Sequence, residues 1–224
     1  MSRAGEHTRS ILGDWKGSLV CDDYAGYQAL WAQGVIEVGC MAHARRYFME
    51  LVTADKSTIA DTAVELIGQL YGIEREVKNL APEHRLEERW RRALPIMQTL
   101  HAWLIAQRVK LTDGGAIAKA IDCSLKRWTA LIRYLDDPAL PIDNNYDEHQ
   151  IRPWALGRAN WQFAGNLVAG RRPVAIKSLI QSARLNGHDS YADLKDVLTR
   201  LPTHKARDID QLLPHLWQPA PTAR

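Results

Sequence analysis

Two short runs, Ser18-Leu-Val-Cys-Asp22 and Val35-Ile-Glu-Val-Gly-Cys40, decide the fold of this chain. Both are rich in apolar and β-branched residues and are short enough to be buried strands. Residues 24–33 between them carry apolar side chains at helical spacing, and residues 41–53 repeat that pattern after the second run. The order strand, helix, strand, helix predicts parallel strands covered by helices. Ligands of such sheets collect at the carboxyl ends of the strands, where Asp22 and Cys40 lie.

The segment that follows, residues 57–135, has a different character. Its apolar side chains recur every three or four residues and strand signals are absent, which predicts an all-helical block. Beyond it, Asp143-Asn-Asn145 offers capping residues for a short helix that Pro153 and Gly157 end or bend. Residues 173–186 predict a further helix.

Charge is distributed unevenly around this capping segment. Five acidic residues and no basic ones lie between Asp136 and Glu148, whereas residues 150–188 hold six Lys or Arg and no acid. Crowded carboxylates repel one another, and a divalent cation is the usual way to hold them together. The basic stretch suits a polyanion. A metal-dependent enzyme acting on nucleic acid is the first hypothesis; the alternative is that Asp22 caps a helix and Glu148 is a solvated surface acid.

Whole-chain composition is less informative. With 224 residues, 46% of them hydrophobic, and a formal net charge of +3, the chain is typical of a soluble globular protein. Its three cysteines are an odd number without framework spacing, which argues against a disulfide-built secreted domain. We find no apolar leader and no run of about 18 apolar residues, so we expect a cytoplasmic protein without a membrane partner.

Four ordered motifs resemble a known family. They are Leu19-Val-Cys-Asp-Asp-Tyr-Ala-Gly-Tyr27, Gly39-Cys-Met-Ala-His-Ala-Arg-Arg-Tyr-Phe48, Ile142-Asp-Asn-Asn-Tyr-Asp-Glu-His-Gln-Ile-Arg-Pro153 and Leu156-Gly-Arg-Ala-Asn-Trp-Gln-Phe-Ala-Gly165. Together they closely resemble the catalytic domain of the insertion-sequence-66 family of bacterial DDE transposases. Residues 178–187 and 212–217 are similar to the ending of that family, so the resemblance covers nearly the whole chain.

The resemblance implies an α/β fold with a partial RNase H-like core that starts βαβα, a large all-helical insertion and a helical C-terminal region. It implies four parts. Residues 1–55 would hold the second catalytic aspartate, and residues 56–137 would form the insertion. Residues 138–188 would carry the catalytic glutamate helix and a basic segment facing DNA, and residues 189–224 the last helix and the tail.

The resemblance also implies a reaction. Asp22 matches the second catalytic aspartate and Glu148 the catalytic glutamate, so both are expected to be catalytic and to bind metal. The implied cofactor is a pair of Mg²⁺ ions, with Mn²⁺ as an alternative, and the implied reaction is cleavage of transposon ends and strand transfer into target DNA. The expected partners are DNA and further copies of the chain, in a complex associated with the bacterial nucleoid.

Further residues receive expected roles within the matched motifs. Six arginines are expected to contact DNA: Arg45, Arg46, Arg152, Arg158, Arg171 and Arg172. Six residues are expected to support the site: Cys40, His43, Asn144, Asn145, Asn160 and Trp161. Either asparagine of the pair at 144 and 145 would cap the glutamate helix. The Cys40-x-x-His43 element leaves two other readings open, which are half of a zinc site and core packing with a satisfied histidine.

The first aspartate of the triad has no counterpart in this sequence. In family members it lies on a strand upstream of the segment that matches residues 13–17. Two hypotheses therefore stay open: the C-terminal part of an active transposase, and an inactive remnant that only binds DNA or a partner. An in-frame strand ending in Asp encoded just upstream of Met1 favours the former, and a stop codon or frameshift there the latter. A third hypothesis, a helical scaffold, predicts that Asp22→Asn and Glu148→Gln leave function unchanged.

Overall fold

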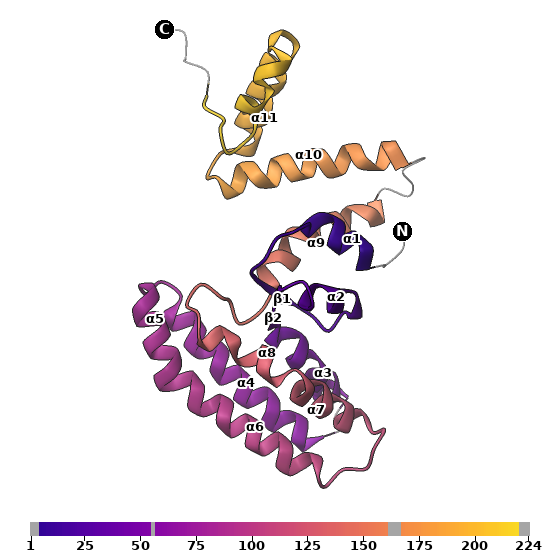
Figure 1. Cartoon of the computed structure of the whole chain (residues 1–224), viewed down its shortest axis with the longest axis vertical. Helices are drawn as coiled ribbons and strands as arrows, with labels where there is room; N and C mark the ends of the chain where they lie inside the picture. The colour runs from indigo at the N-terminus through magenta and orange to yellow at the C-terminus, as the bar shows by residue number, and fades with distance from the viewer. Residues whose placement is uncertain (1–4, 55–56, 161–166, 220–224) are drawn as a thin grey trace. The chain divides into compact units, whose positions relative to one another are not determined.

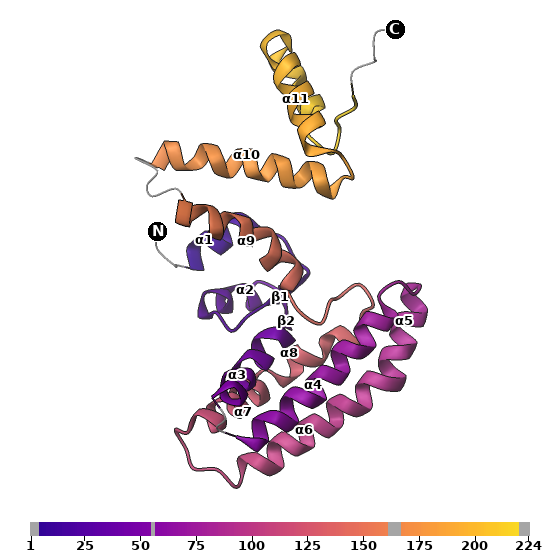
Figure 2. The same cartoon turned by 180° about the vertical axis from the view of Figure 1, so that it is seen from behind.

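The computed structural model describes residues 5–54, 57–160 and 167–219, which form two compact units, residues 1–147 and residues 148–224 (Figures 1 and 2). The first unit contains the strands and most of the helices. The second contains the C-terminal helices, and helix α9 (Asn145–Asn160) starts in the first unit and continues into the second.

The two runs that open the sequence form a parallel pair of strands, β1 (Ser18–Cys21) and β2 (Ile36–Gly39). Val20 pairs with Val38, so both carboxyl ends meet at one edge of the sheet. A 3-10 turn (Ala25–Tyr27) and helix α2 (Gln28–Trp31) connect the strands, and Gly34 follows with a φ of +95°, a conformation that glycine adopts most easily. The predicted order strand, helix, strand, helix is confirmed. Helix α1 (Gly5–Leu12) precedes it.

The predicted helical block is also confirmed. Its long helices, α4 (Thr58–Val77) and α6 (Leu94–Arg108), lie side by side (Figures 1 and 2). Their buried faces share a core in which Ile67, Leu70, Leu100 and Leu104 are at most 2% exposed. Burying one such side chain stabilises a fold by about 1.5–3 kcal/mol. The block and the helix that leads into it consist of α3 (Met41–Thr53), α4 (Thr58–Val77), α5 (Pro82–Glu88), a π-helical turn (Arg89–Ala93), α6 (Leu94–Arg108), α7 (Ala116–Lys126), α8 (Trp128–Ile132) and a 3-10 turn (Arg133–Leu135).

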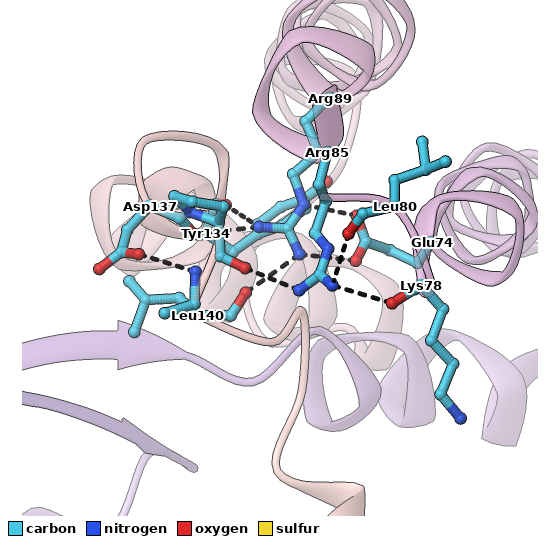
Figure 3. Close-up of polar contacts among 10 residues, drawn as sticks. Glu74, Lys78, Leu80, Arg85, Arg89, Tyr134, Asp137 and Leu140 are labelled. Carbon is cyan, nitrogen blue, oxygen red and sulfur yellow. Dashed lines mark hydrogen bonds and ion pairs between the residues drawn. The ribbon is translucent and has the colours of Figure 1, made fainter. Parts of the chain in front are cut away.

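A buried arginine ties this block to the segment that leaves it. Arg89 is 2% exposed and forms a salt bridge with Glu74 at 2.7 Å. The same guanidinium donates hydrogen bonds to the carbonyl oxygens of Tyr134, Asp137 and Leu140 (Figure 3). Because every carbonyl belongs to the stretch between α8 and α9, Arg89 fixes the path of the chain toward α9.

The second unit is a short helical array. Helices α10 (Leu167–Leu185) and α11 (Ser190–Arg200) pack together, and 3-10 turns (Leu201–Thr203 and Ala206–Leu212) follow them. The indole of Trp217 meets the ring of His188 edge to face at 5.0 Å and donates to Asp196 at 2.8 Å, which closes the tail onto α11.

Two helices differ from the prediction. The helix predicted to end or bend near Pro153 and Gly157 continues to Asn160, and the helix predicted from residue 173 begins at Leu167, with Pro173 inside it. A proline removes a single main-chain donor and crowds the carbonyl four residues earlier, so a helix can continue past it when its other hydrogen bonds form. In outline the α/β class holds: the described residues are mainly helical and carry a small parallel sheet. Within the described ranges we find no helix long and apolar enough to cross a membrane.

Candidate active site

A cavity of about 200 Å³ opens at the carboxyl edge of the two strands. The ends of the strands, helix α3 and the α7–α8 junction enclose it, so the sheet and the helical block both contribute. Its lining consists of Asp22, Asp23, Tyr24, Cys40, His43, Ala44, Arg46, Tyr47, Cys123, Ser124, Arg127 and Leu131. The position agrees with the expectation that ligands of parallel sheets collect at this edge.

Asp22 is the first residue after β1, and its side chain is half-buried in this lining. Its Oδ1 accepts a hydrogen bond from the backbone N–H of Tyr24 at 3.2 Å. This local turn, typical of aspartate, fixes the direction of the carboxylate without using a second side chain. The carboxylate is therefore oriented before any ligand arrives.

Arg127 is the main cation beside the carboxylates. Its Nη2 lies 2.7 Å from Oε1 of Glu37 and donates to the carbonyl oxygen of Cys21 at 3.2 Å. Its Nε lies 3.8 Å from Oδ1 of Asp23, whose side chain is 45% exposed. The guanidinium thus offsets much of the repulsion among neighbouring carboxylates.

Cys40 connects the end of β2 to the start of α9. Its Sγ donates to Oδ1 of Asn144 at 3.0 Å and lies 3.1 Å from Nδ1 of His43. The backbone N–H of Asn144 is 3.5 Å from the same sulfur, and the N–H of Met41 donates to the carbonyl of Ile142 at 3.0 Å. Segment 142–144 is therefore held at the carboxyl edge of the sheet.

A second group of hydrogen bonds shapes the first residue of α9. The carboxylate of Asp143 accepts from the backbone N–H of Asn145 at 3.0 Å and from its side-chain amide at 2.8 Å. Tyr71 donates its hydroxyl to the same carboxylate at 2.6 Å, and burial raises the pKa of this tyrosine. The helix start is thus fixed by α4 as well as by Cys40. Asp143, rather than Asn144, supplies the side-chain oxygen for the N–H of Asn145.

The chemistry of the thiols bears on the zinc reading. Burial raises the pKa of Cys40 and raises that of Cys21 to about 12. Zinc and nucleophilic catalysis both need the thiolate, which burial disfavours at neutral pH. Among the described residues no three His, Cys, Asp or Glu side chains are grouped as metal ligands. In the structure the sulfhydryl of Cys40 donates to Asn144.

A divalent cation with oxygen ligands suits the cavity better. Asp22 and Asp23 contribute carboxylates, the hard ligands that Mg²⁺ prefers. Two neighbouring carboxylates are only part of a ligand set, since the described residues show no group of three. The donor chemistry of these two carboxylates is the kind that suits Mg²⁺.

The structure places the other predicted residues differently. His43 and Arg46 line the cavity with Cys40, whereas Arg45 does not, and its Nε has no hydrogen-bond partner among the described residues. Asn145 starts α9, and Glu148 lies in its first turn but belongs to the second unit. Three of the predicted arginines are exposed in the second unit: Arg152, Arg171 and Arg172. Trp161 and the side chains of Arg158 and Asn160 lie outside the described residues.

Sequence reasoning missed the contribution of the helical block. Tyr47 continues the α3 motif, but Cys123 and Arg127 come from a segment that the sequence predicts to be an insertion without site residues. No sequence signal marks either of them. Arg127 is one of several basic residues near a helix end, and its role is visible only once the block is packed on the sheet.

These features define a mainly helical α/β protein with a cavity at the carboxyl edge of parallel strands, lined by two carboxylates and two arginines. The comparisons then give the family: the model described as "Transposase IS66 family" matches residues 1–172, and the one described as "IS66 C-terminal element" matches residues 178–215. The chain belongs to the IS66 transposase family, as the four motifs predicted.

Two relatives come from Sinorhizobium fredii. The chain is 34% identical to "Uncharacterized protein y4hP" over 99% of its own length and 43% of that protein. It is also 34% identical to "Uncharacterized protein y4jD", over 97% of its own length and 44% of that protein. The chain thus spans less than half the length of these curated relatives. No solved structure matches it.

Proposed function

We propose that this protein acts in DNA transposition as the part of a DDE transposase that carries the second and third acidic residues, within an RNase H-like core. One observation carries the proposal. Asp22 directly follows β1, at the edge of the sheet where Cys40 holds segment 142–144. Asn145, the next residue, starts α9, and Glu148 lies in the first turn of that helix.

Asp22 and Glu148 are the proposed metal ligands. Bound Mg²⁺ would supply activation of the attacking oxygen and stabilisation of the leaving oxygen. The chain itself orients the carboxylate of Asp22 through the N–H of Tyr24 and fixes the start of the glutamate helix through Asp143. Arg152, four residues after Glu148, shares its helix face and would support the glutamate or a phosphate.

Transposon and target DNA are the proposed partners. Arg46 extends from α3 into the cavity lining, where it would contact a phosphate beside Asp22. Arg171 and Arg172 are exposed on α10 and would contact the DNA backbone. Several copies of the chain would assemble on the two transposon ends.

A second candidate is a DNA-binding protein without catalytic activity. The observation that favours it is the absence, among the described residues, of three grouped metal ligands. A pair of carboxylates alone leaves the geometry of a bound cation unfixed.

Strand transfer by the full-length protein separates these candidates. The assay joins labelled transposon ends to target DNA with Mg²⁺ present or absent, for the wild type, Asp22→Asn and Glu148→Gln. Asp14→Asn and Asp147→Asn are matched controls, because each removes a carboxylate with no proposed role. We expect both site variants to lose activity by about a hundredfold or more and both controls to retain it. DNA binding without any Mg²⁺-dependent joining by the wild type would instead support the second candidate.

A further inference from the structure

The guanidinium of Arg127 has no role in the proposed reaction, yet Arg127 lines the cavity. The residue stands at the break between α7 and α8, and its side chain is only 10% exposed. It comes from the helical block, whereas Asp22 follows β1, more than a hundred residues earlier in the sequence. Its contacts nevertheless concentrate on the residues around Asp22.

Those contacts hold the chain on both sides of Asp22. Nη2 of Arg127 donates to the carbonyl oxygen of Cys21 at 3.2 Å, and this carbonyl belongs to the peptide bond that joins Cys21 to Asp22. Nε lies 3.8 Å from the carboxylate of Asp23, the residue after Asp22. Nε and Nη2 also donate to Oε1 of Glu37 at 2.9 and 2.7 Å, which anchors the guanidinium to β2.

The platform that carries Arg127 is itself fixed on the sheet. Arg133, just after α8, donates to the backbone carbonyl of Glu37. At Gly39 a Cβ atom would lie 2.9 Å from Cδ2 of Leu131, so α8 approaches β2 as closely as a glycine allows. The guanidinium is therefore placed by a packed junction, and its planar fork spans a carboxylate and a carbonyl that a lysine could not reach together.

We propose that Arg127 is a positioning residue for Asp22: by holding Cys21 and Asp23, it fixes the backbone from which the Asp22 carboxylate projects. The inference deepens the proposed function and rests on it only for the catalytic task of Asp22. The helical block would then contribute directly to the site. The Arg127 cation offsets the repulsion among the carboxylates of Asp22, Asp23 and Glu37 and leaves Asp22 available for a metal ion.

The test compares Arg127→Gln with Arg133→Gln in the full-length protein. Arg133 is a matched control, because it joins the same helix to the same strand but contacts neither neighbour of Asp22. Amide hydrogen exchange of the peptide covering residues 19–27 reports the position of the backbone directly. The Mg²⁺ concentration for half-maximal strand transfer reports the quality of the metal site. The melting temperature records the purely structural cost of each change.

We expect Arg127→Gln to speed exchange in residues 19–27 and to raise the Mg²⁺ midpoint by about tenfold. Arg133→Gln should change both clearly less than Arg127→Gln does, even if its melting temperature falls as far, because it removes no contact to either neighbour of Asp22. If Arg127→Gln does not fold, Arg127→Lys takes its place, since it keeps the charge and loses the fork. Equal effects of the two variants, or wild-type exchange in the Arg127 variant, would overturn the inference.

The variant Asp22→Asn shows whether a negative result concerns the role of Arg127 or the proposed function itself. If this variant retains strand transfer, the proposed function is wrong, and the exchange measurement still decides whether Arg127 holds the strand end. If it is inactive while Arg127→Gln keeps the wild-type Mg²⁺ midpoint, the function stands and the positioning role is refuted.

Discussion

The sulfur of Cys40 donates a hydrogen bond to Oδ1 of Asn144 at 3.0 Å, across 104 residues of sequence. One partner directly follows β2, and the other directly precedes Asn145, the first residue of α9. The whole helical block lies between them in sequence. This contact therefore returns the chain to the sheet after the block, at the edge where Asp22 projects.

Replacing Cys40 tests this tether. Cys40→Ala removes a sulfur from a site that is 1% exposed and leaves the amide of Asn144 without its partner, so we expect a loss of about 1–3 kcal/mol in the free energy of unfolding. Cys123→Ala is the control, since Cys123 lines the same cavity but is half-buried. Urea denaturation measures both. A Cys40 variant no less stable than the Cys123 variant would show that the tether contributes nothing.

Substitution of Arg89, which forms a salt bridge with Glu74, should destabilise the fold strongly. Arg89→Leu leaves the Glu74 carboxylate and the carbonyls of Tyr134, Asp137 and Leu140 without this donor, so we expect a loss of about 3–5 kcal/mol. Denaturant unfolding monitored by circular dichroism measures it.

An exposed pair provides the control for Arg89. Arg91→Leu breaks an exposed contact with Glu88 and should change stability very little. The double variant Arg89→Leu with Glu74→Leu should recover part of the loss, because no unpaired charge remains. If Arg89→Leu lowers the free energy of unfolding no more than Arg91→Leu does, the contacts of Arg89 do not hold the stretch between α8 and α9.

Alkaline pH should weaken the fold through Cys21. Burial raises the pKa of this thiol from 9.0 to about 12, so between these values the unfolded chain releases a proton that the folded chain retains. The stability that Cys21 contributes is complete below pH 9 and is lost as pH rises toward 12, by up to about 1.4 kcal/mol per pH unit.

Urea denaturation at a series of pH values from about 8 to about 10.5 measures this slope. Cys21→Ala should give a shallower decline over the same range, because the titrating group is gone. A decline of the same steepness in the variant would assign the alkaline loss to other groups, such as the buried tyrosines.

The sequence predicted the parts of this structure that depend on local pattern. The strand runs ending at Asp22 and Cys40 and the helical periodicity of residues 57–135 all appear as expected. The sequence predicted that α9 ends or bends at Pro153 and Gly157, and the helix continues to Asn160. The start predicted for α10 near Pro173 was wrong, because the helix begins at Leu167: a proline costs one hydrogen bond, and neighbouring turns can sustain the helix.

The site was predictable where motifs are contiguous and unpredictable where it depends on packing. Asp22, Cys40, His43 and Arg46 all line the cavity, and each follows directly from a strand end or from the helix after it. Arg127 could not be found in this way. Its role depends on how α7 and α8 pack on the sheet, and no periodicity or spacing in the sequence predicts that packing.

The central claim, that Asp22 and Glu148 bind the same metal ions, is tested most directly by locating the metal. We would soak Mn²⁺ into crystals of the full-length protein bound to transposon-end DNA and measure the anomalous signal. We expect a manganese ion about 2.1 Å from carboxylate oxygens of both Asp22 and Glu148. A metal bound at Cys40 and His43, or one that contacts neither acid, would contradict it.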